Sequence, residues 1–274
     1  MENTIGNQQA INSQASSKLL AVVRHGERFD ECALDDELKY GSEEYYDTHL
    51  TDVGRLNSWS TGYKLAELIW NHQRHAGGYP RVKFVSSLFY RCLQTCQSLR
   101  DGMKQYIEEH QTEFDNPEAA LKMVLSEPTY VEEACSEKIY LLPEEGIENM
   151  RIIKSRENIL KQFSNINPVV SGLFDYSGDH MNLSLRTRHN SKDDLQIACN
   201  TFIKHTVSSL VDDPGYDVYV VITHAMYISA ALLTSRIMAS SSIKYNACLL
   251  LGIEANPDKD KPDVKAIVKS KPIF

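Results

Sequence analysis

The stretch LLAVVRHGER, residues 19–28, predicts most about the fold of this chain. Its first five residues are apolar, which is typical of a short strand buried on both faces of a sheet. The predicted strand runs directly into Arg24 and His25. Because ligands of open α/β sheets bind at the carboxyl ends of the strands, this pair is a candidate site. Gly26 comes next, and its small size would let the backbone pass close to a neighbour.

Two more predicted strands end in similar residues. The apolar strand at 218–222 leads to His224, and the strand at 82–85 leads to Arg91 at the start of a helix. A lone histidine in such a place is ordinarily solvated or hydrogen-bonded, so each feature alone is weak. The prediction depends on two histidines and three arginines, counting Arg28, that follow strands at one edge of the sheet. Arginines gather in this way to bind oxyanions through forked hydrogen bonds.

The composition is that of an ordinary globular protein, and it disfavours several classes. The chain has 274 residues, and 29 Lys and Arg against 37 Asp and Glu give a formal net charge of −8. Such an acidic chain is not expected to bind nucleic acid, which requires a basic surface. It contains no apolar run long enough to span a membrane and no apolar signal core near its start, so we expect a cytoplasmic protein without a membrane partner. Its six cysteines should then be reduced.

Strand and helix patterns alternate along the sequence. This alternation predicts an α/β fold in which helices cover both faces of a mostly parallel central sheet. We expect strands at 18–23, 82–85, 123–125, 218–222, 247–253 and 264–268. We expect helices that begin at Thr51, that span about 93–106 and 191–210, and that run from about 225 to 238.

The chain is expected to form one domain. Residues 1–17 are polar and rich in Gln, Asn and Ser, which predicts a disordered tail. No linker pattern interrupts residues 18–274. The stretch 127–190 carries several Pro and Gly residues with weak periodicity. It indicates an insertion with one or two short helices around 147–163.

The helix that begins after residue 50 has a recognisable start. Thr51 has the position of an N-cap, because apolar residues recur after it at helical spacing. The expected buried face of this helix consists of Val53, Leu56, Tyr63, Ala66 and Ile69.

Together these motifs resemble those of the histidine phosphatase superfamily, also called the phosphoglycerate-mutase-like fold. The matches stand in the family's order and cover about residues 18–100 and 193–253, and their combination is highly specific. Residues 19–28 resemble the RHG motif, and residues 50–54 resemble the helix opening that follows it. Residues 86–95 resemble the second-arginine segment, and residues 221–225 resemble the second-histidine strand.

Arg28 and Asp30 extend the first motif to RHGERxD. This pattern most resembles the phosphatase module of the TULA type (suppressor of T-cell receptor signalling) and the related ecdysteroid-phosphate phosphatases. The resemblance implies a three-layer α/β fold. It also implies a phosphatase that needs neither a metal ion nor a cofactor.

The resemblance further implies a role for each residue at the sheet edge. His25 is the nucleophile: its neutral imidazole attacks phosphorus in line and forms a phosphohistidine that water hydrolyses. Arg24, Arg28 and Arg91 bind the phosphate, and a protonated His224 completes the ring of groups that stabilise the transition state. The expected substrates are phosphorylated small molecules or phosphopeptides.

A general acid must protonate the leaving oxygen. The segment Glu127-Pro128-x-x-x-Glu132 resembles the family's E-P-x-x-x-E, whose second glutamate is the acid. This implies Glu132. Glu133 remains an alternative, because the sequence departs from the aromatic residue that usually follows the acid.

Three other functions were weighed. A mutase-type phosphotransferase has the same fold, but the loop 30–47 carries eight acidic residues and one lysine, and such a rim repels small polyanions. A catalytically inactive phosphate-binding scaffold is disfavoured by the complete set of histidines and arginines. A metal-dependent hydrolase is disfavoured because the sequence lacks an ordered ligand motif such as HExxH.

Overall fold

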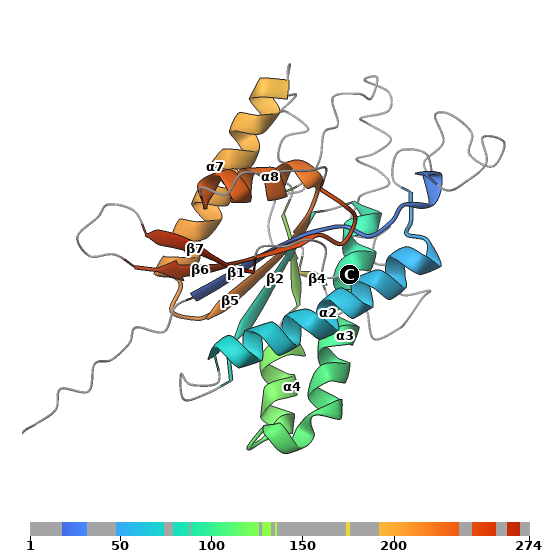
Figure 1. The fold of residues 1–274 in the computed structure, drawn as a ribbon, viewed down its shortest axis with the longest axis vertical. Coiled ribbons are helices and arrows are strands. Elements are labelled where there is room, and N and C mark those ends of the chain that lie inside the picture. The colour runs from blue at the N-terminus through green and yellow to red at the C-terminus, as the bar shows by residue number, and fades with distance from the viewer. Residues whose placement is uncertain are drawn as a thin grey trace, which may run out of the picture.

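A seven-stranded sheet lies at the centre of the described structure (Figure 1). In spatial order its strands are β4 (Phe174–Asp175), β3 (Thr129–Val131), β2 (Val82–Ser86), β5 (Val218–Thr223), β1 (Lys18–Arg24), β6 (Cys248–Glu254) and β7 (Asp263–Val268). The first five are mutually parallel, and β6 and β7 run antiparallel to their neighbours. The computed structural model describes residues 18–31, 48–73, 79–87, 89–125, 128–132, 135, 174–175, 192–235, 243–255 and 262–268.

Helices cover both faces of this sheet (Figure 1). One face carries α2 (Asp52–Gln73), α3 (Tyr90–Glu109) and α4 (Pro117–Leu125), and the other carries α7 (Lys192–Asp212) and α8 (Ala225–Thr234). The predicted α/β fold with a mostly parallel sheet is therefore confirmed. Within the described ranges, none of these helices combines the length and the apolar character that a membrane crossing requires.

Strand β1 is buried on both faces, as its unbroken apolar sequence predicts. Leu19, Ala21 and Val23 pack toward α2 and α3, whereas Leu20 and Val22 pack toward α7 and α8. All five are completely buried. The strand thus fixes where the polar residues that follow it must lie.

The predicted buried face of α2 is wrong in its first turns. Val53 is 54% exposed and Leu56 is 63% exposed, although the N-cap is confirmed because the Thr51 hydroxyl accepts a hydrogen bond from the Gly54 N–H (2.8 Å). The face that packs on α3 is built from small residues instead. A Cβ atom on Gly62 would lie 1.9 Å from the carbonyl oxygen of Leu99, so the two backbones touch. Hydrophobic spacing does not reveal such a contact.

The predicted strand at 123–125 is also wrong, since these residues end α4. Asn116 caps this helix by accepting a hydrogen bond from the Ala119 N–H (2.9 Å), and Pro117 stands at its first position, where a missing N–H costs nothing. The third strand in sequence is instead β3. A short apolar run occurs in helices as well as in strands, and its length alone does not distinguish the two.

Each of the other predicted strands matches an observed strand to within one residue at both ends. Strands β3 and β4 come from the stretch predicted to be an insertion, and they form one edge of the sheet. The predicted tail at 1–17, the short helices around 147–163 and the helix end near 238 lie outside the described residues.

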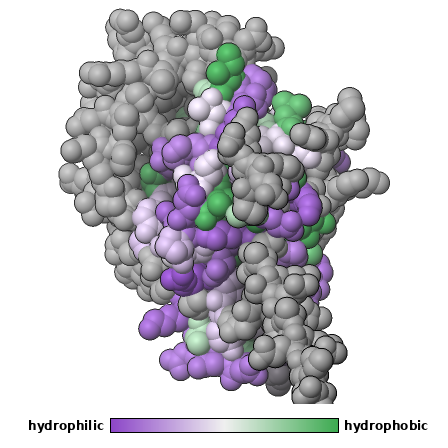
Figure 2. Space-filling view, turned by 90° about the vertical axis from the view of Figure 1, so that its left-hand side faces the viewer, coloured by the Kyte–Doolittle hydropathy of each residue, from purple (hydrophilic) through white to green (hydrophobic). Residues whose placement is uncertain are grey.

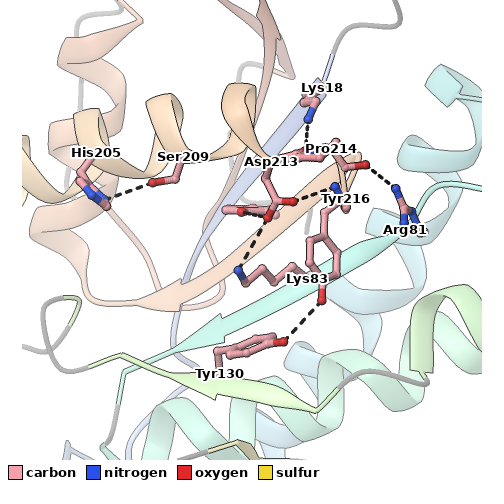
Figure 3. A network of polar contacts seen from close by, with 11 residues as sticks. Lys18, Arg81, Lys83, Tyr130, His205, Ser209, Asp213, Pro214 and Tyr216 are labelled. Atoms are coloured by element: carbon pink, nitrogen blue, oxygen red, sulfur yellow. Dashed lines mark hydrogen bonds and ion pairs between the residues drawn. The ribbon is translucent and has the colours of Figure 1, made fainter. Parts of the chain in front are cut away.

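A polar cluster joins the strands at the amino end of the sheet (Figure 3). The ammonium group of Lys83 lies 4.7 to 5.2 Å from the ring centres of Tyr130, Tyr216 and Tyr219. The Tyr219 hydroxyl donates to the carboxylate of Asp213 (2.7 Å). Burial of the Tyr219 hydroxyl, together with this carboxylate, raises the pKa of Tyr219. The cluster links β2, β3 and β5 at the end opposite to the two histidines.

Figure 2 shows the hydropathy of one face of the molecule. In the face shown in Figure 2, hydrophilic side chains dominate the described part, and hydrophobic ones form small separate patches between them. Such scattered apolar residues are normal on globular proteins.

Candidate active site

The carboxyl ends of three parallel strands bring the predicted residues together. In the register of the sheet, Arg24 pairs with Thr223. The N–H of His25 donates to the Thr223 carbonyl (2.9 Å), and the N–H of Ser87 donates to the Ile222 carbonyl (2.9 Å). The residues that follow β1, β2 and β5 are therefore fixed to one another by backbone hydrogen bonds.

The two histidines meet at this edge. The ring centres of His25 and His224 are 5.2 Å apart in an edge-on arrangement, and only 2% and 1% of these residues is exposed. Sequence reasoning placed them together although 198 intervening residues separate them in the chain.

The hydrogen bonding of His25 fixes its tautomer. Its Nδ1 lies 2.8 Å from the carbonyl oxygen of Gly26. Because a carbonyl can only accept, Nδ1 must carry the proton. In the neutral ring, Nε2 then holds a free lone pair. This is the protonation pattern that a nucleophilic histidine needs.

Electrostatics keep this ring neutral. Burial lowers the pKa of His25 well below its ordinary value, and the nearby cations Arg91, His224 and Arg24 lower it further. The hydrogen bond to the Gly26 carbonyl opposes this change and does not reverse it. The imidazole is thus available as a base or a nucleophile at neutral pH.

His224 is held from its other side. Its Nε2 lies 3.1 Å from the hydroxyl oxygen of Ser87 and 3.7 Å from the sulfur of Cys92. The ring of Phe89 packs against it edge-on. These contacts leave the ring close to His25 and fix its orientation.

Two arginines converge on the histidines. Arg91, in the first turn of α3, is 3% exposed, and its guanidinium lies 4.3 Å from the ring centre of Phe89. Arg24 donates through Nη1 to the carbonyl oxygen of Ile243, and the part of the chain that the structure describes offers it no ion-pair partner. Arginines gathered in this way are suited to bind an oxyanion.

Arg28 has a different environment from the other two. Its Nε donates to Asp30 Oδ1 (2.9 Å), and its Nη2 bonds Asp30 Oδ2. A guanidinium has five N–H donors, and this fork uses two of them. Sequence reasoning named both residues but did not foresee that they pair.

The loop after β1 is tied to the neighbouring helices. The N–H of Gly26 donates to the hydroxyl oxygen of Thr95 (2.9 Å), which in turn donates to the carbonyl of Arg91 (2.7 Å). A Cβ atom on Gly26 would lie 2.7 Å from the carbonyl oxygen of Gly54. Only glycine therefore fits here, as the sequence predicted.

Glu132 follows β3 at the same edge of the sheet. Its N–H donates to the carbonyl of Ser86 (2.9 Å), and its own carbonyl accepts from the thiol of Cys135 (3.0 Å). The carbonyl of Cys135 accepts from the Thr223 hydroxyl, which links this segment to the end of β5. The alternative acid, Glu133, lies outside the described residues.

Sequence reasoning missed one segment of the site, residues 243–247. It enters β6, which runs antiparallel to β1, so it passes the carboxyl end of β1. Tyr245 places its ring beside both His25 and Arg24. Asn246 has a φ of 54°, a left-handed conformation that asparagine tolerates better than most residues. An isolated asparagine before a strand was the available signal.

No metal site is evident among the side chains described: no three of His, Cys, Asp or Glu gather there as ligands. The groups around His25 that can bind an oxyanion are cationic or hydrogen-bond-donating side chains, namely Arg24, Arg91 and His224. Arg28 pairs with Asp30 in the loop after β1.

The fold is similar to that of a solved phosphatase structure, and two further structures align with lower TM-scores. The ecdysone phosphate phosphatase from Bombix mori, solved in complex with tungstate, is 15% identical, with a TM-score of 0.50, over 94% of this chain and 97% of that one. A mycobacterial glucosyl-3-phosphoglycerate phosphatase is 13% identical, with a TM-score of 0.47, over 92% and 98%. A phosphoserine phosphatase from Entamoeba histolytica is 11% identical, with a TM-score of 0.44, over 93% and 99%.

These similarities concern the fold, since a fold hosts many functions. The sequence itself matches no family model and no curated protein.

Proposed function

We propose that this chain is a phosphatase that hydrolyses phosphomonoesters through a phosphohistidine formed on Nε2 of His25. The observation that carries the proposal is the state of this ring. It is buried beside Arg24, Arg91 and His224, its Nδ1 is tied to a carbonyl, and its pKa is lowered. A neutral histidine among fixed cations is suited to attack an anionic centre.

In the first step, Nε2 attacks phosphorus in line and the bond to the leaving oxygen breaks. Glu132 gives its proton to that oxygen, so the alcohol leaves neutral. Arg24 and Arg91 stabilise the charge on the equatorial oxygens, and His224 donates a further hydrogen bond. These donors are fixed before the substrate arrives, so little reorganisation is needed.

In the second step, water attacks the phosphohistidine. The carboxylate of Glu132 takes a proton from the water, and the bond between Nε2 and phosphorus breaks. Inorganic phosphate leaves, and His25 returns to its neutral state with Nδ1 still bonded to Gly26. Apart from the substrate and water, this scheme uses only protein side chains.

Within the histidine phosphatase superfamily, the pattern RHGERxD favours the TULA type and the ecdysteroid-phosphate phosphatases. The fork between Arg28 and Asp30 supports a role for both residues. Asp30 would hold one edge of the guanidinium and so fix its orientation for binding phosphate. We expect the substrates to be phosphorylated small molecules or phosphopeptides.

A hydrolysis screen tests this function. Aryl phosphates, phosphotyrosine peptides, sugar phosphates and nucleotides are offered to the chain after thorough chelation of divalent ions. We expect release of inorganic phosphate that chelation does not abolish, and its loss in His25→Ala. His205→Ala, on an exposed part of α7, is the matched control and should keep full activity. Activity that needs added Mg²⁺ or Zn²⁺ would contradict the proposal.

A further inference from the structure

We propose that Tyr245 is a positioning residue for the phosphate site, because its ring holds the guanidinium of Arg24 in the orientation that binds phosphate. This inference rests on the proposed function and adds to it a residue that the motifs do not contain.

The backbone first brings this segment to the site. Val23 pairs with Cys248, so the residues just before β6 lie beyond the end of β1. The N–H of Arg24 donates to the carbonyl of Ala247 (2.9 Å), and the N–H of Asn246 donates to the carbonyl of His25 (3.2 Å). The segment is thus bonded to both residues of the candidate site.

The turn at Asn246 is fixed in its own right. Its left-handed backbone ends the turn before β6, and its side-chain oxygen lies 2.8 Å from the buried hydroxyl of Ser58 on α2. Tyr245, the preceding residue, therefore stands next to a fixed turn. Its ring lies over the guanidinium of Arg24.

Two groups then constrain the guanidinium of Arg24. The carbonyl of Ile243 accepts a hydrogen bond from Nη1, and the Tyr245 ring centre lies 4.0 Å from Cζ. A ring at this distance attracts the cation and covers one side of it. The Nε atom of Arg24 is buried and donates to no acceptor among the described residues. This donor is available for an anion beside His25.

The same ring also lies beside the proposed nucleophile, His25. The ring centres of Tyr245 and His25 are 5.6 Å apart with the planes tilted by 47°. Tyr245 is half-buried, so it forms a side wall of the site rather than part of the core. The contact with Arg24 is made by the π-face of the ring.

The test compares Tyr245→Phe, which keeps the ring, with Tyr245→Leu, which removes it. Inorganic vanadate is the probe, because it mimics the phosphoryl group. We expect Tyr245→Phe to keep kcat/KM and vanadate affinity within about twofold. We expect Tyr245→Leu to weaken vanadate binding by about 2- to 30-fold, the range of cation–π contacts, with a matching fall in kcat/KM. Tyr63→Leu, on α2 away from the site, controls for loss of a half-buried tyrosine and should change neither.

A double-mutant cycle separates positioning from general damage. Vanadate affinity is measured by calorimetry in an Arg24→Met background as well. If Tyr245 acts through Arg24, Tyr245→Leu should have almost no further effect there. An equal effect in both backgrounds would overturn the proposal, as would no effect of Tyr245→Leu in the unchanged chain.

Thermal unfolding is recorded for each variant. If Tyr245→Leu does not fold, Tyr245→Met replaces it, because methionine fills irregular space well and carries no π-face. Failure of the proposed function would be seen without any variant: the unchanged chain would neither hydrolyse phosphomonoesters nor bind vanadate, and both proposals would fall.

Discussion

The state of one residue, His25, underlies the proposed chemistry, and the stability of the protein should reveal it. Burial and neighbouring cations lower the pKa of His25 in the folded chain from its ordinary 6.5. As the pH falls through about 6.5, the unfolded chain takes up a proton at this residue and the folded chain does not. Unfolding is therefore favoured by acid, and the folded chain loses stability in that range.

His25→Gln removes this titration. Between pH 7.5 and 5.5, we expect the variant to gain about 1 kcal/mol in free energy of unfolding relative to the unchanged chain. Urea denaturation at both pH values measures the difference. A difference that is independent of pH, or that changes in the opposite direction, would mean that the pKa of His25 is not lowered in the folded chain.

The two neighbouring glutamates can be distinguished by their effect on different leaving groups. An alkyl alcohol leaves poorly without a proton, whereas a nitrophenolate leaves well. Glu132→Gln should slow the hydrolysis of alkyl phosphates by about 10²- to 10⁴-fold, the usual contribution of a general acid, and that of nitrophenyl phosphate much less. The measurement is kcat/KM for both substrates, which reports the steps up to formation of the phosphohistidine and not its hydrolysis.

Glu133→Gln is the matched variant and should change both rates little. If the contrast between substrates occurs in Glu133→Gln instead, Glu133 is the acid. If it occurs in neither variant, the proton comes from another group.

At the scale of elements, the contact between α2 and α3 holds one wall of the site. The Thr51 end of α2 bonds the loop after β1, since the Thr51 hydroxyl donates to Glu27 (2.9 Å), and α3 supplies Arg91. The two helices touch through glycines at Gly62 and Gly102, where a Cβ atom would lie 1.9 Å from a backbone oxygen of the other helix. A backbone atom cannot move aside as a flexible side chain can.

Gly62→Ala should therefore destabilise the fold by about 2 kcal/mol or more, even though alanine favours helices by up to about 1 kcal/mol. Leu56→Ala, at a position that is 63% exposed, should change the free energy of unfolding by no more than about 0.5 kcal/mol. Urea denaturation of both variants is the measurement. A larger loss of unfolding free energy in Leu56→Ala than in Gly62→Ala would contradict this account and support the buried face that hydrophobic spacing predicts.

At the scale of the whole molecule, the sequence predicted the fold where apolar runs and motifs coincide. The strands before His25 and His224 were recognised because each is continuously apolar and ends in polar residues. Strand direction was not recognised, since an apolar run does not encode it. This is why Tyr245, which reaches the site only because β6 is antiparallel, escaped prediction.

The missed details share a second physical cause. The fork between Arg28 and Asp30 depends on side-chain geometry, and the buried face of α2 depends on how closely two backbones approach. Neither property is expressed in residue spacing. The short apolar run at 123–125 became the end of a helix because Asn116 and Pro117 start one just before it.

The molecule as a whole combines a net charge of −8 with basic side chains gathered at one edge of its sheet, of which Arg91 and His224 are buried. An anionic substrate that forms a bond to His25 explains this combination. The most direct test of this explanation is to trap that bond. Glu132→Gln should slow the attack of water more than the attack on an aryl phosphate, so the phosphorylated protein should accumulate.

The measurement is a rapid alkaline quench with labelled nitrophenyl phosphate, followed by mass spectrometry of the peptides. We predict phosphate on the peptide that contains His25, stable in alkali and labile in acid, and absent from His25→Ala. Turnover that leaves no phosphate on His25 in the Glu132→Gln chain, or phosphate on a different residue, would contradict the central claim.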